Sequence, residues 1–241
     1  MPTITVYECY GLTGIQQILN ALHNTRIGNS WITAKPNKYT KHEVFIQYFW
    51  YEDIEDGLKK IFSDEESEEI VTFLKRNGKT QVLKRVYCFI NFLTKTLEVY
   101  RGPDKKTDEI VNNLSKLLKV KFKRLTIDSG TLQEIFTRHS TELKQAMFKN
   151  IDGLLYEILR GQKLEQNEKF KSYLQKFPSC LRVISFRPNI KFLNGGKYQV
   201  TLNGDKGTVK LSSNGLFQWR PRFEIRQIVF LIAATLGLLS H

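Results

Sequence analysis

The sequence predicts an α+β protein: a mixed N-terminal α/β part, a helical middle, and a C-terminal antiparallel β-meander closed by an apolar helix. Short β-branched and aromatic runs alternate with segments of helical periodicity in the first half. Glycine-containing turns separate short alternating runs after residue 181. The last apolar run, Ile228–Leu239, has the length of a buried helix. We expect two domains, residues 1–127 and 128–241.

The N-terminal part begins with strands and helices that are clearly separated. Thr3–Tyr10 is rich in β-branched and aromatic residues and predicts a strand. Apolar residues at helical spacing from Ile15 to Leu22 predict a helix. The run "EVFIQYFWY", Glu43–Tyr51, is almost wholly apolar, so we expect a strand that is covered on both faces. A helix is expected from about Asp64, where acidic residues complement the positive end of the helix dipole.

The segment Val82–Ile127 predicts a hairpin, a helix and a basic strand. Two apolar runs flank "TKT" between Val82 and Arg101. An apolar stripe then predicts a helix that ends near Leu118. In Lys119–Ile127, alternation places three lysines on one face. This order of elements resembles many small α+β nucleic-acid-binding units, including half of the TATA-binding saddle, and the resemblance carries over no residue.

The second half predicts a helical middle followed by strands. We expect Ser129–Arg160 to be mostly helical, with a break at Gly153. Between Leu181 and Arg220, period-two alternation assigns two faces to a β-meander. The apolar face carries Tyr198, Val200, Leu202, Val209, Leu211, Phe217 and Trp219, and the polar face carries Lys197, Gln199, Thr201, Thr208, Lys210, Gln218 and Arg220.

The charge of the chain is strongly positive and unevenly distributed. There are 37 Lys and Arg against 24 Asp and Glu, a net charge of +13. Nine of the acids fall between Glu52 and Glu69, whereas Leu181–Arg226 holds nine basic residues and two acids. Such a balance predicts attraction to polyanions and says nothing about the fold.

The first functional hypothesis is therefore a non-enzymatic nucleic-acid-binding protein. Cations would contact phosphates, while amides and hydroxyls would form direct hydrogen bonds. The sequence does not distinguish DNA from RNA. The candidate contact residues are Lys119, Lys121, Lys123, Lys197, Lys210, Gln218, Arg220, Arg222 and Arg226.

Two other functions stay open. The positive C-terminal part could dock an acidic protein partner. The acids from Glu52 to Asp56 could hold Mg²⁺ in a metal-dependent nuclease, although no neighbouring E-x-K pair accompanies them. The four histidines are isolated, and no GxSxG, HExxH or P-loop motif occurs. The sequence favours a protein that is not an enzyme, and we expect no cofactor and no bound metal.

Cysteine usage and hydropathy indicate the cellular setting. Cys9, Cys88 and Cys180 are widely spaced and odd in number, which favours reduced thiols and a cytoplasmic location. We expect neither a secretion signal nor a membrane span. The oligomeric state does not follow from the sequence.

Overall fold

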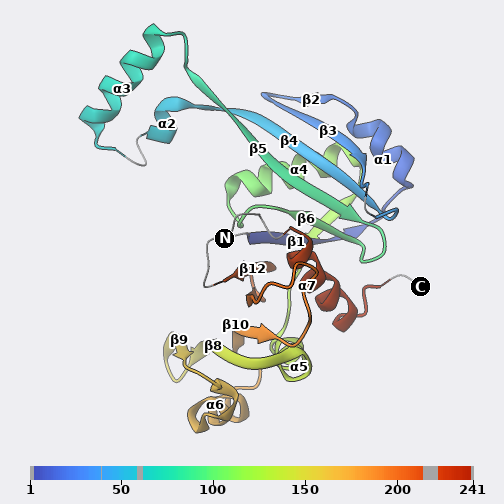
Figure 1. Ribbon diagram of the computed structural model, residues 1–241, viewed down its shortest axis with the longest axis vertical. Helices are drawn as coiled ribbons and strands as arrows, with labels where there is room; N and C mark the ends of the chain where they lie inside the picture. Colours follow the sequence, from blue (N-terminus) through green and yellow to red (C-terminus); the bar gives the residue numbers. More distant parts are fainter. Residues whose placement is uncertain (1–2, 39, 59–61, 214–221, 240–241) are drawn as a thin grey trace. The chain divides into compact units, whose positions relative to one another are not determined.

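The computed structural model describes residues 3–38, 40–58, 62–213 and 222–239 (Figure 1). The chain is an α+β protein, and its strands pair in antiparallel fashion. Its internal contacts divide it into two compact units. The smaller unit is Thr13–Cys88, and the larger unit combines Met1–Leu12 with Phe89–His241. The two domains expected on either side of residue 127 rest on a change of sequence character, and that division stays a prediction.

The smaller unit is a sheet with one helix packed on it. Strand order is β2-β3-β4-β5, and α1 contacts β3 and β4. The side chain of Ser63 accepts a hydrogen bond from the Glu66 amide, and the Glu66 carboxylate accepts one from the Ser63 amide, so a capping box starts the predicted acidic helix, α3. The elements are α1 (Ile15–Leu22), β2 (Thr25–Ile27), β3 (Ser30–Pro36), β4 (Glu43–Asp53), α2 (Ile54–Leu58), α3 (Asp64–Arg76) and β5 (Gln81–Asn91), whose last residues belong to the larger unit.

Strand β4 is not covered equally on both faces, which corrects the expectation from its apolar composition. Burial alternates along it: Val44, Ile46 and Tyr48 are fully buried, whereas Phe45 and Phe49 on the other face are only partly buried. The buried residues face α1, whose Ile18 and Leu22 are also fully buried. The second face carries aromatic residues, so the composition of β4 resembles that of a strand buried on both faces.

The larger unit is built on a second run of antiparallel strands. Their order is β6-β1-β12-β11-β10-β8-β9, and β7 pairs with the second half of β1. The elements are β1 (Thr3–Tyr10), β6 (Thr96–Val99), α4 (Lys105–Leu118), β7 (Lys121–Arg124), α5 (Ser129–His139), β8 (Ser140–Ile151), β9 (Leu154–Arg160), a 3-10 turn (Leu164–Gln166), α6 (Glu168–Lys176), β10 (Leu181–Pro188), β11 (Gln199–Asn203), β12 (Thr208–Ser212) and α7 (Arg222–Thr235).

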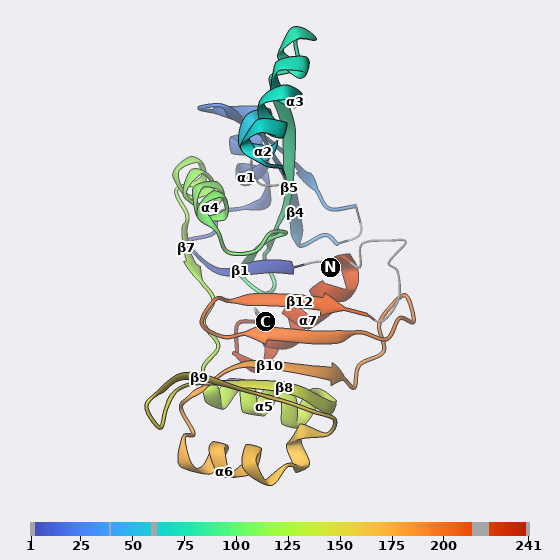
Figure 2. The ribbon, with the colours of Figure 1, turned by 90° about the vertical axis from the view of Figure 1, so that its left-hand side faces the viewer.

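One face of β8 and β10–β12 forms the core of this unit with α5 and α7. Alternate residues such as Leu202, Val209 and Phe186 are at most 1% exposed. They join Ile228 and other residues of α7 in one apolar cluster. Figure 2 looks onto β12 and β10 with α7 behind them. Because side chains alternate along a strand, the opposite face of the same strands carries their polar residues.

The β11–β12 turn is locked by two glycines. The amide of Gly204 donates to the Arg182 carbonyl, and the Gly204 carbonyl accepts from the Ile127 amide at 3.1 Å. A Cβ on Gly204 would lie 2.1 Å from the Ile127 carbonyl oxygen, and one on Gly207, which has φ +56°, would lie 2.3 Å from the carbonyl oxygen of Leu125. Glycine is therefore required for the turn to approach the β7–α5 connection.

The helical middle predicted from Ser129 to Arg160 is wrong beyond His139. The chain after α5 forms the antiparallel hairpin β8–β9, which pairs with β10. Ile151 lies across from Leu154, so the connection is the two residues Asp152 and Gly153, both with positive φ. Asp-Gly is a preferred pair for such a hairpin turn. The Leu, Lys, Gln and Met residues around Gly153 favour helices, which is why the pattern indicated a helix with a break there.

The basic strand is shorter than predicted, and Lys119 is not part of it. Lys119 ends α4 in the left-handed conformation with φ 54°, and β7 starts at Lys121. At the C-terminal end, α7 begins at Arg222 and covers most of the expected apolar helix. The described part of the chain contains no helix of sufficient length and apolar character to span a bilayer.

Candidate nucleic-acid interface

A row of polar side chains crosses the larger unit on the face away from α5 and α7. Strand register places Thr201 directly between Lys210 and Ser185, and Gln145 between Ser185 and Arg160. Cross-strand partners share a face of the sheet. We call this surface the polar sheet face; its members are Glu142, Gln145, Arg160, Ser185, Arg187, Lys197, Gln199, Thr201, Thr208 and Lys210.

The centre of the polar sheet face is a hydrogen-bonded network of uncharged groups. The hydroxyls of Ser185 and Thr201 lie 2.8 Å apart, and the Gln199 Nε2 donates to Ser185 Oγ at 2.6 Å. Ser185 is 2% exposed, so the network forms the floor of the surface. At one end the Arg160 Nε donates to Gln145 Oε1 at 3.1 Å, and at the other end Lys210 is exposed. The floor is thus neutral, and a cation stands at either end.

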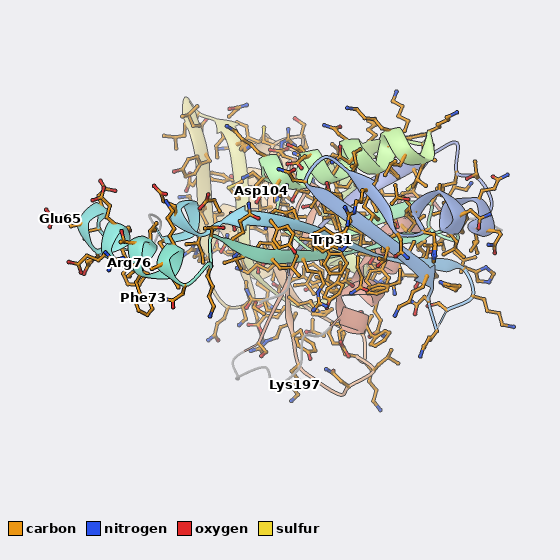
Figure 3. All side chains as sticks on the ribbon, turned by 90° about the horizontal axis from the view of Figure 1, so that it is seen from above. Trp31, Glu65, Phe73, Arg76, Asp104 and Lys197 are labelled. Carbon is orange, nitrogen blue, oxygen red and sulfur yellow. The ribbon has the colours of Figure 1, made fainter. Side chains whose placement is uncertain are left out.

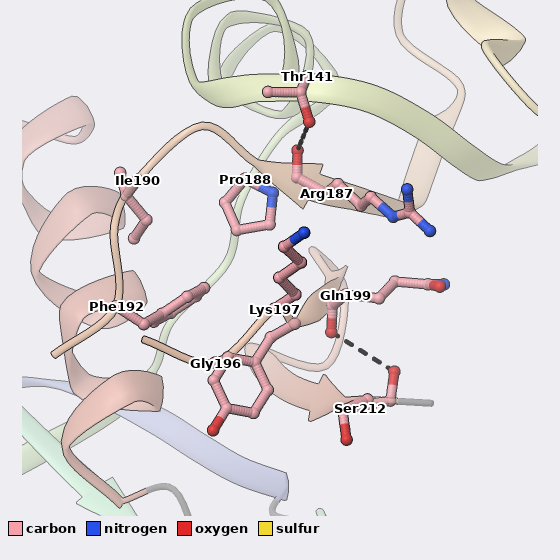
Figure 4. Close-up of a pocket in the computed structure, with 11 residues that line it drawn as sticks. Thr141, Arg187, Pro188, Ile190, Phe192, Gly196, Lys197, Gln199 and Ser212 are labelled. Atoms are coloured by element: carbon pink, nitrogen blue, oxygen red, sulfur yellow. Dashed lines mark hydrogen bonds between the residues drawn. The ribbon is translucent and has the colours of Figure 1, made fainter. Parts of the chain in front are cut away.

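A pocket of about 610 Å³ opens at one end of this face, where β10, β11 and β12 meet the Ile190–Gly196 loop (Figure 4). Lys197 and Arg187 both line it, together with the side chains of Gln199 and Ser212. Figure 4 shows the Lys197 ammonium group turned toward the Arg187–Pro188 segment. The residues of the described chain that line the pocket include no carboxylate. It therefore has the charge and hydrogen-bonding groups of an anion site.

Glu142, which lies directly across from Arg187, is a carboxylate of the polar sheet face, and Asp205 lies in the β11–β12 turn; each already contacts two cations. Glu142 pairs with Arg187 at 3.3 Å and also with Lys144. The hydrogen bond from Lys144, aided by the charge of Arg187, lowers the pKa of Glu142 below its usual range. Asp205 pairs with Arg182 at 3.2 Å and also with Lys149. The partners of both acids are therefore cations other than Lys197 and Lys210.

The structure separates the lysines that the sequence placed in one track. Lys210 lies across from Thr3 of β1, whereas Lys123 lies across from Glu8. Residues 3 and 8 point to opposite faces of the strand, so Lys121 and Lys123 lie on the face opposite to Lys210. Glu8 sits beside Lys123 there, and Lys119 is an exposed residue at the end of α4.

The remaining predicted residues lie in or near α7. Arg226 forms an ion pair with Glu98 at 3.2 Å, with side-chain exposures of 11% and 2%, and its guanidinium lies 4.4 Å from the centre of the Phe89 ring. This places Arg226 in the interior of the larger unit, on the side of the sheet away from Lys210. Arg222 is the first residue of α7. Gln218 and Arg220 lie outside the described residues, as do Phe217 and Trp219.

Sequence reasoning missed part of the polar sheet face. Gln145 and Arg160 belong to β8 and β9, for which the sequence predicted a helix, and Ser185 and Arg187 were not singled out. The Asp152–Gly153 turn signal would have revealed the hairpin. Period-two alternation along the two strands would then have placed Gln145 and Arg160 on the same face of the hairpin.

Two of the acids considered for a metal-dependent nuclease, Glu52 and Glu55, form ion pairs with lysines. Glu52 pairs with Lys84 at 3.4 Å and Glu55 with Lys75 at 3.2 Å. Over residues 3–38, 40–58, 62–213 and 222–239, no group of three or more His, Cys, Asp or Glu side chains is arranged to hold a metal ion. No specific observation favours the nuclease.

Comparison with known proteins adds no assignment to this geometry. No protein-family model matches the chain, and no curated protein is significantly similar to it.

Proposed function

We propose that this protein binds nucleic acid and that the polar sheet face of the larger unit contacts the sugar–phosphate backbone. The observation that supports this is the register-aligned row from Lys210 to Arg160, with Lys197 and Arg187 in the pocket beside it. Cations attract phosphates, and hydroxyl and amide groups hydrogen-bond to phosphate and sugar oxygens. The proposed role is positioning of the backbone, without sequence readout.

The size of the row fits an extended polyanion. Four strand spacings of about 4.8 Å separate Lys210 from Arg160, which gives roughly 19 Å. Successive phosphates of one strand in B-form DNA are separated by a rise of about 3.4 Å, so several phosphates can follow the row. A single small anion would occupy only the pocket of Lys197 and Arg187.

The test compares two double charge reversals on opposite faces of the same sheet. Lys197→Glu with Lys210→Glu alters the polar sheet face, and Lys121→Glu with Lys123→Glu makes the same charge change on the other face. Each phosphate that the protein no longer neutralises should reduce the log–log salt slope of duplex binding by about 0.9, so the first pair should reduce it by roughly 1.8. The second pair should leave the slope near that of the wild type.

Binding is measured by fluorescence anisotropy with a labelled duplex at several salt concentrations. Equal losses of affinity in the two double variants would show attraction by net charge alone and reject the site. If the wild type binds no nucleic acid but binds an acidic polypeptide, the same surface serves an acidic protein partner and the nucleic-acid proposal fails.

The proposal includes a reducing, cytoplasmic setting. Cys9, Cys88 and Cys180 are all free thiols, and burial raises the pKa of the Cys9 and Cys88 thiols far above the usual value. Iodoacetamide should therefore modify Cys180 first in the native protein, because thiolate is the reactive form. Peptide mass mapping checks the order. A disulfide among these residues in protein isolated from cells would contradict the proposal.

A further inference from the structure

The smaller unit also has one sheet face that α1 does not cover, and its chemistry is different. Trp31 lies across from Phe49 and from Arg26 in the strand register, which places all three on one face. Tyr51 follows two residues after Phe49 on the same strand. The side chains that define this aromatic face are Arg26, Trp31, Lys35, Phe45, Phe49, Tyr51, Arg85 and Tyr87.

The rings of the aromatic face stack in two groups. Trp31 and Phe49 are nearly parallel, with centroids 5.2 Å apart and 9° between their planes, and the Tyr51 centroid lies 5.4 Å from that of Trp31. Phe45 and Tyr87 stack at 5.5 Å. Tyr51 is 50% exposed, and Trp31 and Phe49 are partly exposed. Aromatic rings are thus partly exposed to solvent on this face, whereas the opposite face of the same strands forms a buried core.

Cations accompany these rings, and the carboxylates that β2–β5 place on the aromatic face lie at its ends. Lys35 lies 5.5 Å from the centre of the Phe45 ring, and the Arg85 guanidinium lies 4.7 Å from that of Tyr87. The strands β2–β5, all of which the structure describes, contain three acids, and all three belong to β4. Alternation puts Glu52 on the side of α1 and puts Glu43 and Asp53 at opposite ends of the aromatic face.

The carboxylate at the Phe45 end is buried and already hydrogen-bonded. Glu43 is 4% exposed, and it accepts hydrogen bonds from Asn37 Nδ2 at 2.6 Å and from Thr40 Oγ1 at 2.8 Å. Its charge is therefore turned toward Asn37 and Thr40 and away from solvent. At the Tyr51 end, the exposed Asp53 accepts a hydrogen bond from the Glu55 amide at 2.9 Å. The exposed charges among the rings themselves are positive, so this part of the aromatic face attracts an anionic ligand.

A pocket of about 630 Å³ lies at the end of the aromatic face where Trp31 and Tyr51 are found. Figure 3 labels Trp31 on β3. The pocket combines two aromatic rings, one exposed cation and several amide side chains: its lining includes Asn24, Arg26, Asn29, Trp31, Tyr51 and Gln81.

This combination is selective for unpaired bases. An unpaired base presents a π face that stacks on an aromatic ring, a hydrogen-bonding edge that amides can read, and a neighbouring phosphate that Arg can contact. Bases in a duplex are already stacked and paired, so they cannot reach the rings. Phe49 and Tyr51 are separated by about 7 Å along β4, which lets successive bases of one strand use successive rings.

We propose that the aromatic face binds single-stranded nucleic acid, with a base stacked on Trp31 and Tyr51 and Arg26 contacting the adjacent phosphate. The amides of Asn24, Asn29 and Gln81 contact the edge of that base. This site uses other strands and another kind of interaction than the polar sheet face, so it stands whether or not the larger unit binds phosphates.

The experiment titrates the full chain with a labelled single-stranded oligonucleotide and follows anisotropy together with tryptophan fluorescence. Tyr51→Leu keeps an apolar side chain and removes the π face, and we expect about tenfold weaker binding. Trp31→Ala should weaken binding by a comparable factor, and Trp31→Phe should recover part of it. Phe73→Ala is the control, because Phe73 is an exposed aromatic residue of α3 outside the aromatic face.

Each outcome decides the proposal. Unchanged affinity of Tyr51→Leu, with circular dichroism like the wild type, would overturn it. Equal affinity for a mononucleotide and for the oligonucleotide would show a nucleotide pocket and not a strand-binding face. Lys197→Glu with Lys210→Glu should preserve the effect of Tyr51→Leu on single-strand affinity, so a failure of the polar sheet face is recognised separately.

Discussion

The sheet face that α1 does not cover in the smaller unit and the polar sheet face of the larger unit share an architecture and differ in chemistry. Helix α1 buries one face of β3 and β4, and α5 and α7 bury one face of β8 and β10–β12. Alternation gives the other face of each group of strands a distinct set of side chains. The polar sheet face of the larger unit has hydroxyls and amides between cations. The aromatic face of the smaller unit has stacked rings between cations. The first suits phosphates and the second suits bases, so the difference lies in the part of a nucleic acid that each can recognise.

The prediction with the largest expected effect tests whether the polar sheet face contributes to binding more than to stability. Phe186→Ala removes a fully buried ring of β10 and should lower the free energy of unfolding by about 3–5 kcal/mol. Arg187→Ala, one residue later on the polar sheet face, should cost less than about 1 kcal/mol because the pair with Glu142 is largely exposed on the arginine side. Urea denaturation measures both. Similar costs would mean that the polar sheet face is structural.

A second prediction removes Arg226 from the set of nucleic-acid contacts. Arg226→Gln leaves the nearly buried Glu98 without its ion pair and should cost about 3 kcal/mol of stability. Duplex affinity measured at a temperature where the variant is folded should be unchanged. Arg160→Gln, on the polar sheet face, should leave the stability nearly unchanged and weaken duplex binding. A stable Arg226→Gln variant with weakened duplex binding would show that Arg226 contacts nucleic acid and would contradict this prediction.

The smallest expected effect concerns the carboxylate beside the pocket. Glu142 has a lowered pKa, so its ion pairs stabilise the fold above the pKa of the unfolded chain, and this contribution is lost as the pH falls through the lower pKa of the folded state. Glu142→Gln removes the negative charge at neutral pH and frees Arg187 and Lys144. We expect duplex affinity to rise by about two- to fivefold, a change typical of one screened charge, with little change in single-strand stacking. Anisotropy titrations at pH 7 measure both; weaker duplex binding would contradict the role of Arg187.

Local sequence signals predicted much of the fold. The strand Thr3–Tyr10, the helices near Ile15 and Asp64, and the alternation in β11 and β12 all follow from spacing and turn residues close in sequence. The β8–β9 hairpin was not predicted because its residues favour helices individually, and the decisive Asp152–Gly153 turn has the same glycine that a helix break would have.

The candidate surfaces were harder to predict because they depend on long-range register. Lys123 and Lys210 look equivalent in sequence, yet both are positioned by β1, and its residues 8 and 3 point to opposite faces. The aromatic face escaped notice for another reason. Phe45, Phe49 and Tyr51 belong to an almost wholly apolar run of residues. The sequence therefore does not distinguish these partly exposed rings from core residues, and the position of α1 is needed to do so.

The central claim is that phosphates and bases are contacted by two different faces. Mapping amide chemical-shift changes in isotope-labelled protein, first with a duplex and then with a single strand, tests it most directly. The account predicts that the duplex perturbs residues around Lys197, Thr201 and Lys210, and that the single strand adds perturbations around Trp31 and Tyr51. Duplex-induced changes centred on Lys121 and Lys123, or an identical response to both ligands, would contradict it.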